Sequence, residues 1–111
     1  KGHLADIDYY KKAIAEISKR APGTLFYIFS DDIDWCRKQF VGADRIKFVD
    51  DTDKNDAIGD FVCMMHCKNN IIAYSTYSWW AAMLNSNISK IVISPEFYDS
   101  KGFLPKGWIQ L

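Results

Sequence analysis

Three hydroxyl residues lie close together in the chain, between two apolar runs. Ser75, Thr76 and Ser78 follow a short uncharged run that is typical of a strand buried on both faces. The run that begins at Trp79 is typical of an apolar helix. The first turn of a helix has unpaired N–H groups and the positive end of the helix dipole, so it favours phosphate oxygens. Ser and Thr at a helix start more commonly act as caps. The pattern leaves both interpretations open, a phosphate site and a helix cap.

Polar side chains also follow two other predicted strands. Ser30, Asp31 and Asp32 follow the strand predicted at residues 24–29, which we expect to be buried, and the strand predicted at residues 90–94 ends in Ser94. The carboxyl ends of parallel strands meet at one edge of a sheet, which is where nucleotides usually bind. We therefore expect these groups to lie at the same edge as the central hydroxyl residues.

The sequence contains none of the common phosphate-binding or serine hydrolase motifs. Neither GxGxxG nor GxxxxGK(S/T) occurs, and Ser75 lacks the flanking glycines of a nucleophile elbow. What remains is hydrogen-bond donation from hydroxyl groups and backbone N–H groups at a helix start. This arrangement suits a diphosphate that is bound without a glycine-rich loop.

Cysteine and histidine residues are too few for a structural zinc site. Cys63, His66 and Cys67 could face a metal from one helix, but only His3 and Cys36 could complete the four ligands that such a site needs. We therefore expect no metal. An odd number of cysteines is usual in reducing compartments, so we expect a cytoplasmic protein, with contact to a membrane surface left open.

Length and charge define the broad class of the protein. The chain has 111 residues, of which 49% are hydrophobic and 25% charged, as in a single globular domain. Fourteen basic and fourteen acidic side chains cancel, which argues against nucleic acid as a partner. The longest weakly polar run, residues 71–84, is shorter than the roughly 20 residues that cross a bilayer. The chain lacks an initiating Met and an apolar signal segment, so we expect a fragment of a longer protein.

Helices and strands are predicted to alternate along the chain. We predict helices at 6–20, 33–40, 60–67 and 77–84, and strands at 24–29, 46–49, 71–74 and 90–94. Parallel strands need helical crossovers, so this order indicates an α/β fold with three layers, in which about four parallel strands have helices on both faces. The strand at 71–74 should be central because it is nearly uncharged. The remaining residues look irregular, with Trp108, Ile109 and Leu111 as anchors.

Two further expectations concern single helix residues. Ser30 or Asp31 is the natural N-cap of the helix at 33–40. Trp79 and Trp80 are adjacent, and adjacent helix residues point about 100° apart, so at least one of them should be buried. We expect Trp80 in the core and leave Trp79 as a candidate for stacking on a base or sugar.

Two strings in the sequence resemble a known family. SDDIDWC, from Ser30 to Cys36, and STYSWWAA, from Ser75 to Ala82, resemble the C-terminal part of the alpha-1,2-fucosyltransferases, glycosyltransferase family 11. Asp60 and the residues around it also fit the family pattern. The resemblance extends from the first helix to Ile109, which is nearly the whole chain.

The resemblance implies a GT-B-like enzyme whose Rossmann-like C-terminal half binds GDP-fucose. Such an enzyme transfers fucose with inversion to the 2-hydroxyl of a galactoside, with no cofactor and no obligatory metal, and its N-terminal half is the partner of this domain. Asp60 matches an acidic residue that contacts guanine. Ser75, Thr76 and Ser78 match the segment near the ribose and diphosphate. Asp31, Asp32 and Trp79 are further candidates for the donor site.

Three departures from the family pattern leave an alternative open. The family usually has Asn where this chain has Tyr74, and His where it has Asn69. The arginine-rich HxRRGD segment, whose arginine would offset the diphosphate charge as fucose leaves, should precede Lys1. We therefore expect the catalytic residues upstream and no activity from these 111 residues alone. The alternative is a non-catalytic α/β interaction or regulatory domain that kept the fold and lost the site.

Overall fold

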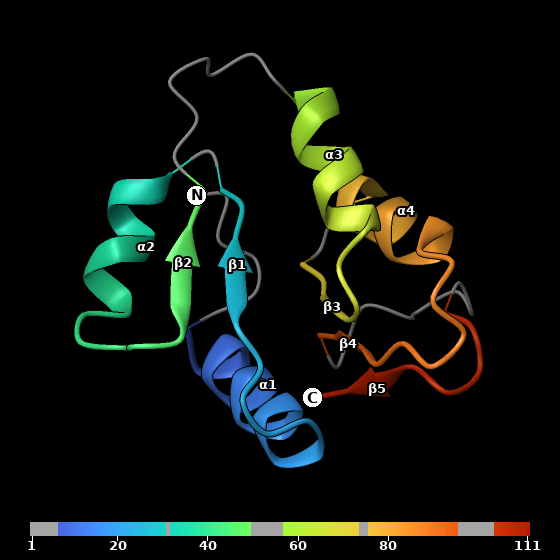
Figure 1. The fold of residues 1–111 in the computed structure, drawn as a ribbon, viewed down its shortest axis with the longest axis horizontal. Helices are drawn as coiled ribbons and strands as arrows, with labels where there is room; N and C mark the ends of the chain where they lie inside the picture. The colour runs from blue at the N-terminus through green and yellow to red at the C-terminus, as the bar shows by residue number, and fades with distance from the viewer. Residues whose placement is uncertain (1–6, 31, 50–56, 74–75, 96–103) are drawn as a thin grey trace.

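The computed structural model describes residues 7–30, 32–49, 57–73, 76–95 and 104–111 (Figure 1). These residues form four helices and five short strands. In chain order the elements are α1 (Ile7–Arg20), β1 (Phe26–Ile28), α2 (Ile33–Gln39), β2 (Ile46–Phe48), α3 (Ala57–Met65), β3 (Asn70–Ile71), α4 (Thr76–Leu84), β4 (Val92–Ser94) and β5 (Ile109–Gln110). The predicted alternation of helices and strands is confirmed.

The described strands form two small parallel sheets instead of the predicted single sheet. One sheet pairs β1 with β2, and the other has the order β3-β4-β5. In the second sheet, Ile71 is in register with Ile93, and Ile93 with Ile109. The prediction that residues 71–74 form the central strand is wrong for this sheet, because β4 lies between β3 and β5. Strand β5 falls in the segment that was expected to be irregular.

Helix α1 covers one face of both sheets. Its buried residues Tyr9, Ala13 and Ile17 recur every four positions and pack with Phe26 of β1 and Ile93 of β4 in one core cluster. The Tyr9 hydroxyl lies 2.6 Å from the carbonyl oxygen of Ile72 and 3.0 Å from that of Ile93, and it shares its single proton between them. The amphipathic helix predicted at 6–20 is thus confirmed, and it joins the two sheets.

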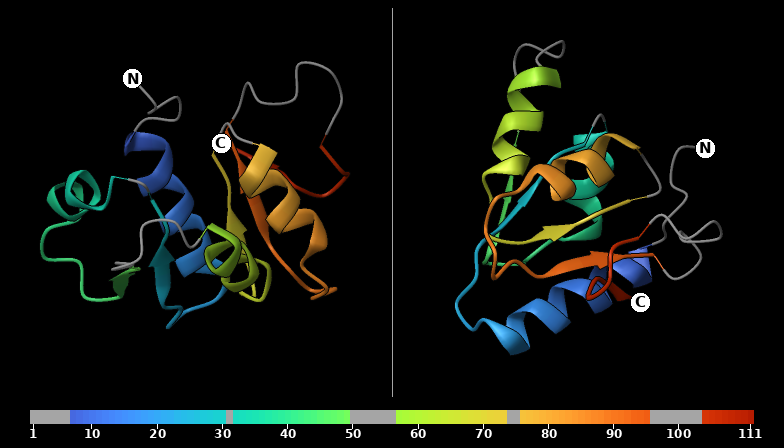
Figure 2. Two further views of the ribbon diagram at one scale, coloured as in Figure 1. Left: turned by 90° about the horizontal axis from the view of Figure 1, so that it is seen from above. Right: turned by 90° about the vertical axis from the view of Figure 1, so that its right-hand side faces the viewer.

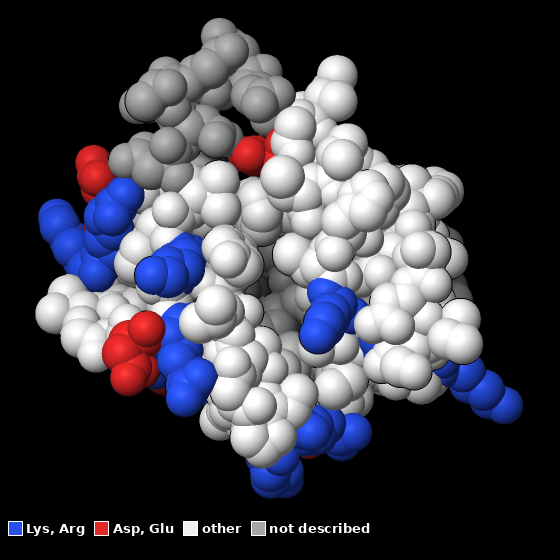
Figure 3. Space-filling model, viewed as in Figure 1, with Lys and Arg blue, Asp and Glu red and all other residues white. Residues whose placement is uncertain are grey.

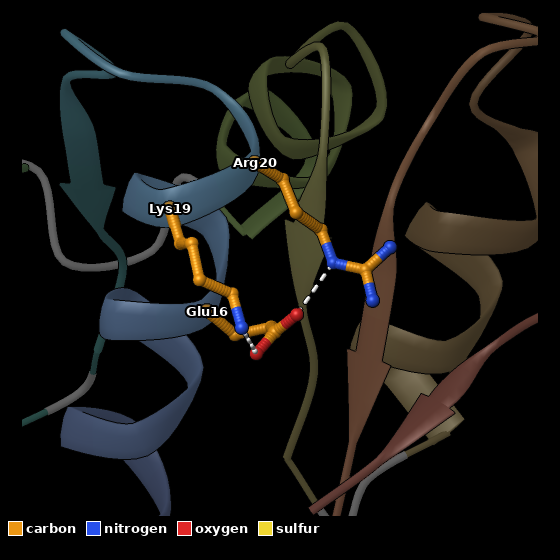
Figure 4. A network of polar contacts seen from close by, with 3 residues as sticks. All are labelled: Glu16, Lys19 and Arg20. Carbon is orange, nitrogen blue, oxygen red and sulfur yellow. Dashed lines mark hydrogen bonds and ion pairs between the residues drawn. The ribbon is translucent and has the colours of Figure 1, made fainter.

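The outer face of α1 has a small charged network (Figure 4). The Arg20 side chain donates to Glu16 at 2.5 Å, and the Lys19 ammonium lies 3.6 Å from the same carboxylate. The hydrogen bond from Arg20 is the main reason that the pKa of Glu16 is lowered. These side chains are exposed to solvent, so the ion pairs contribute little to stability.

Helix α4 covers the opposite face of the β3-β4-β5 sheet. Ile72, Val92 and Ala82 form a second buried cluster, and Trp79 and Trp108 pack against it. Along β4, Val92 therefore faces α4 and Ile93 faces α1, as expected from the alternation of side chains along a strand. The right-hand view of Figure 2 shows the three layers, with α1 below the strands and α4 above them. Helices on both faces are confirmed for this sheet, and Trp108 is confirmed as an anchor.

Three local predictions are wrong. Trp80 is 51% exposed, because Trp79 faces the sheet and its neighbour points about 100° away.

The N-cap of α2 is Asp32, whose carboxylate accepts from the Trp35 N–H at 3.3 Å, whereas the Ser30 hydroxyl accepts from the Asp32 N–H at 3.0 Å. The strand at 24–29 is only half-buried, because Phe26 faces α1 while Tyr27, its neighbour, points to the other face and is 54% exposed.

The outer surface of α3 and α4 is apolar. Asp60 is the one charged residue in these two helices. Ile58, Val62, Trp80 and Leu84 all expose more than two fifths of their surface. Figure 3 shows this surface nearly free of charged side chains, which gather instead over the elements at the other side of the view. In the part of the chain that the structure describes, no helix has the length and hydropathy needed to cross a membrane.

Candidate functional site

The predicted junction between a strand and a helix is present. Strand β3 ends at Ile71, and α4 begins at Thr76. Ser75 and Tyr74 lie outside the described residues, so their roles stay predictions. Helix α4 has nine residues, and the N–H groups of its first turn lie at the carboxyl end of β3. The structure thus places the start of an apolar helix where an anion would be bound in an open parallel sheet.

Ser78 ties α4 to the end of β3. Its side chain is buried, with 6% of the residue exposed. The Ser78 hydroxyl accepts a hydrogen bond from the Ala73 N–H at 3.2 Å and lies 3.4 Å from the Ala73 carbonyl oxygen. This hydroxyl thus holds the first turn of α4 against Ala73. A phosphate bound at the helix start would meet a backbone that Ser78 already holds in place.

Asp60 lies next to a residue of α3 that contacts the first turn of α4. The rings of Phe61 and Tyr77 meet edge to face, with centroids 5.4 Å apart. Asp60 precedes Phe61, and Tyr77 lies between Thr76 and Ser78 in the chain. Helix α3 begins at Ala57, three residues earlier than predicted, so Asp60 lies at the end of its first turn. The first turn of α3 therefore ends one residue before the side chain that contacts the first turn of α4.

Two buried polar atoms near α4 have no hydrogen-bond partner among the described residues. They are the Ser94 hydroxyl oxygen and the indole nitrogen of Trp79. Ser94 ends β4 and is fully buried. The sequence identified Ser94 as a polar residue at a strand end, but only the structure shows that its hydroxyl is covered and unpaired. Trp79, a candidate from the sequence, packs against the sheet beside Trp108, and its ring centroid lies 6.5 Å from that of Trp108.

The structure describes only one residue of the acidic pair after β1. Asp31 lies outside the described residues. Asp32 is exposed and caps α2 through the Trp35 N–H. Its carboxylate thus has a local structural role, and a role in donor binding stays a prediction.

The comparison with known families now decides between classes of protein. The family model for Glycosyl transferase family 11 matches residues 1–109. The chain belongs to glycosyl transferase family 11. This membership agrees with the resemblance carried by the SDDIDWC and STYSWWAA strings. No solved structure matches the chain.

Relatives of this family 11 chain include bacterial and mammalian enzymes. It is 42% identical over 89 residues to the O-antigen biosynthesis glycosyltransferase WbnK of Escherichia coli, a match that covers 80% of the chain and 30% of the relative. It is 33% identical to an alpha-1,2-colitosyltransferase of the same species, over 93% of the chain and 38% of the relative. It is 33% identical to the galactoside 2-alpha-L-fucosyltransferase SEC1 of Bos taurus, over 76% of the chain and 23% of the relative. The chain thus spans less than two fifths of each relative's length.

The amino ends of β3 and β4 in this family 11 chain contain a second polar cluster. Asn85, which follows α4 and is 5% exposed, donates to the Cys67 carbonyl at 2.6 Å and to the Asn70 side-chain oxygen at 2.8 Å. Asn70 in turn donates to the Met64 carbonyl at 2.9 Å. These amides bind one carbonyl group in the last turn of α3 and one that follows the helix. The cluster joins the ends of α3 and α4 to β3.

Asn69 and Lys90 extend this cluster to β4. The Asn69 side-chain oxygen accepts from the Ile91 N–H at 2.7 Å. The Lys90 ammonium donates to the carbonyl oxygens of Ala82 and Asn85, at 2.7 and 2.8 Å. Asn69 therefore lies at the amino end of the strands, away from the start of α4. Its departure from the family pattern falls outside the candidate donor site.

A shallow depression of about 330 Å³ lies beside the same cluster, lined by residues 65–68 and 85–87. The side chains of His66 and Cys67, which follow α3, contact carbonyl groups of that helix: the His66 Nδ1 lies 2.8 Å from the Val62 carbonyl, and the Cys67 thiol donates to the Cys63 carbonyl at 3.3 Å. Burial, and then the nearby Cys63, raise the pKa of the Cys67 thiol. Among the described residues, no group of three His, Cys, Asp or Glu side chains is placed to hold a metal ion. The depression lies at the end of the strands opposite to the candidate site.

Proposed function

We propose that the chain is the donor-binding part of a longer fucosyltransferase that moves L-fucose from GDP-fucose to the 2-hydroxyl of a galactoside. The observation that carries this proposal is the start of α4, with its STYSWWAA string, at the carboxyl end of a parallel strand in a family 11 chain. The galactoside 2-alpha-L-fucosyltransferases among the relatives support the choice of reaction. The relatives are more than twice as long as this chain, so the acceptor site and the catalytic residues are assigned to the rest of the enzyme.

The donor diphosphate binds at the start of α4. The N–H groups of the first turn donate to phosphate oxygens, and the helix dipole favours their negative charge. The hydroxyls of Ser75 and Thr76 add further donors in this proposal. Ser78 contacts Ala73 through its hydroxyl, and in this proposal the same hydroxyl also donates to a bound phosphate. An arginine from the upstream part of the enzyme stabilises the diphosphate when fucose leaves.

The guanine base is read by Asp60. A carboxylate can accept hydrogen bonds from both the ring N–H and the exocyclic amine of guanine, whereas adenine presents no such pair of donors on that edge. The contact between Phe61 and Tyr77 supports this role, because Phe61 follows Asp60 in α3 and lies against the first turn of α4. The base and the diphosphate would then bind to neighbouring helices.

Calorimetry with GDP and ADP tests the role of Asp60 in the complete enzyme. The wild type should prefer GDP, and Asp60→Ala should lose most of that preference, because hydrogen bonds to a charged group are worth about 1.5–3 kcal/mol, or roughly tenfold or more in affinity. Asp34→Ala is the matched control, since Asp34 also lies in the first turn of a helix and is exposed. An Asp60→Ala enzyme that keeps the wild-type preference would show that another residue reads the base.

The relatives leave one alternative for the donor sugar. One relative is an alpha-1,2-colitosyltransferase, and its match covers 93% of the chain. A colitosyl donor is therefore the second candidate, with the same type of linkage. Competition between GDP-fucose and the corresponding colitosyl donor, measured with the complete enzyme, distinguishes the two. A preference for the colitosyl donor would keep the proposed site and change only the sugar.

A further inference from the structure

The Ser94 hydroxyl is an unpaired donor in the core of the protein. The residue is fully buried, and its oxygen has no hydrogen-bond partner among the described residues. Buried polar groups are normally hydrogen-bonded, because an unpaired one loses its interactions with water and gains nothing in return. An exception in a folded protein calls for a physical explanation. A ligand that brings an acceptor to this oxygen would provide one.

The geometry of the sheet places this hydroxyl on the α4 side. Val92 packs against Ile72 and Ala82 beneath α4, and Ser94 is two residues further along the same strand, so it points to the same face. The Ile72 N–H donates to the Ile93 carbonyl at 2.9 Å, which sets Ser94 beside the segment that leads from β3 to α4. Ser94 is also the last residue of β4 and therefore lies at its carboxyl end. Its hydroxyl is thus next to the strand-to-helix junction.

A second buried donor lies on the same face. Trp79 is the fourth residue of α4, and its indole N–H has no partner among the described residues. It packs on the cluster of Ile72 and Val92, the same face of the sheet that Ser94 occupies. Two unpaired donors beside the start of one helix distinguish this end of the sheet from the amino end, where Asn70 and Asn85 have partners within the chain.

We propose that Ser94 is a further donor-binding residue, whose hydroxyl donates a hydrogen bond to the diphosphate bound at the start of α4. This inference rests on the proposed function and extends it to a second strand, since the hydroxyl residues of the STYSWWAA string follow β3 and Ser94 ends β4. The oxygen is covered in the structure, so binding of the diphosphate includes a local rearrangement at the ends of β3 and β4. The unpaired hydroxyl is the reason that such a rearrangement is favourable when the ligand is present.

The test compares Ser94→Ala with Ser18→Ala in the complete enzyme, because Ser18 is exposed on α1, the helix that covers the opposite face of the sheet from α4. Isothermal titration measures the affinity for GDP and for guanosine, which has no phosphate. Ser94→Ala should weaken GDP binding by about tenfold, the loss expected for one hydrogen bond to a charged group, and leave guanosine binding unchanged. Ser18→Ala should change neither.

The melting temperature of the unliganded variants supplies the second readout. Removing an unpaired buried hydroxyl should leave the melting temperature of Ser94→Ala equal to that of the wild type or raise it. A Ser94→Ala enzyme that binds GDP as tightly as the wild type, or one that melts several degrees lower, would overturn the inference. If the wild type itself fails to bind GDP, the proposed function is wrong, which is a different result from a Ser94→Ala enzyme that retains GDP affinity.

Discussion

The two ends of β3 and β4 differ in how their buried polar side chains are paired. At the amino ends, Asn70, Asn85 and Lys90 bind one another or the carbonyl groups of α3 and α4. At the carboxyl ends, Ser94 and the indole of Trp79 have no partner among the described residues. Both ends contain polar residues, but only the second has hydrogen-bonding capacity that the described chain does not use.

This difference separates a structural cluster from a candidate site. Polar side chains that satisfy helix ends stabilise the fold and leave little for a ligand. The shallow depression beside Asn85 belongs to this kind of surface, even though His66, Cys67 and Lys68 line it. Unpaired donors beside a helix start differ from such groups, because they leave hydrogen-bonding capacity for a ligand. The depression and the candidate site therefore lie at opposite ends of the same strands.

Removal of the Asn85 amide should have the largest effect on stability. Asn85→Ala leaves the Asn70 side-chain oxygen and the Cys67 carbonyl without their donor in a buried cluster. The free energy of unfolding should fall by about 2–4 kcal/mol, from two or three lost hydrogen bonds and the groups they leave unpaired. Urea unfolding measures it, with the exposed Ser86→Ala as control. A loss no greater than that of Ser86→Ala would show that the amino end is not the structural cluster we describe.

Ser78 should affect both properties, because it lies at the carboxyl end and still has a structural bond. Ser78→Ala removes the acceptor of the Ala73 N–H, which should lower the free energy of unfolding by about 1 kcal/mol. It should also weaken GDP-fucose binding by about tenfold. Calorimetry and urea unfolding of the complete enzyme, with the exposed Ser89→Ala as control, separate the two effects. Unchanged donor affinity would leave the structural bond to Ala73 as the role of this hydroxyl.

The smallest expected effect concerns the thiols at the amino end. Burial, followed by the proximity of Cys63, raises the pKa of the Cys67 thiol, so less of it is ionised at any given pH than in an ordinary cysteine. The thiolate is the reactive form, so iodoacetamide should modify Cys67 more slowly than the exposed Cys63 at pH near the ordinary cysteine pKa of about 8.5. The rate at Cys67 should continue to rise at higher pH. Mass spectrometry of modified peptides measures both rates, and equal rates would contradict the assignment of Cys67 to a protected, structural position.

The order of helices and strands could be predicted because the signals are local. Apolar residues at helical spacing identify α1, and the run of hydroxyl residues identifies the start of α4. Strand β5 was missed because it has only two residues, Ile109 and Gln110, and its pairing with Ser94 and Ile93 is a tertiary contact. A two-residue strand has no periodicity of its own.

The sequence predicted which segment of the chain contains the candidate site, but not which of its side chains are buried. Strand-to-helix order located the turn before α4, but the burial of Ser94 depends on how β4, α4 and the rest of the fold pack together. Trp79 and Trp80 show the same limit. Their sequence neighbours are equally apolar, so only the position of the sheet under α4 decides that Trp79 faces inward and Trp80 outward.

The contacts of Tyr9 determine when this domain can fold during synthesis. Its hydroxyl binds the carbonyl oxygens of Ile72 and Ile93, which lie 63 and 84 residues further along the chain. Helix α1 is synthesised before these strands, so it can pack on β1 and β2 early but on β4 only after β4 has emerged. Until then Tyr9, Ala13 and Ile17 lack the part of their core that β4 supplies. Contacts of such long sequence separation also slow folding, because the chain must close large loops before they form. We therefore expect nascent chains that stop before β4 to leave α1 exposed to proteases and chaperones.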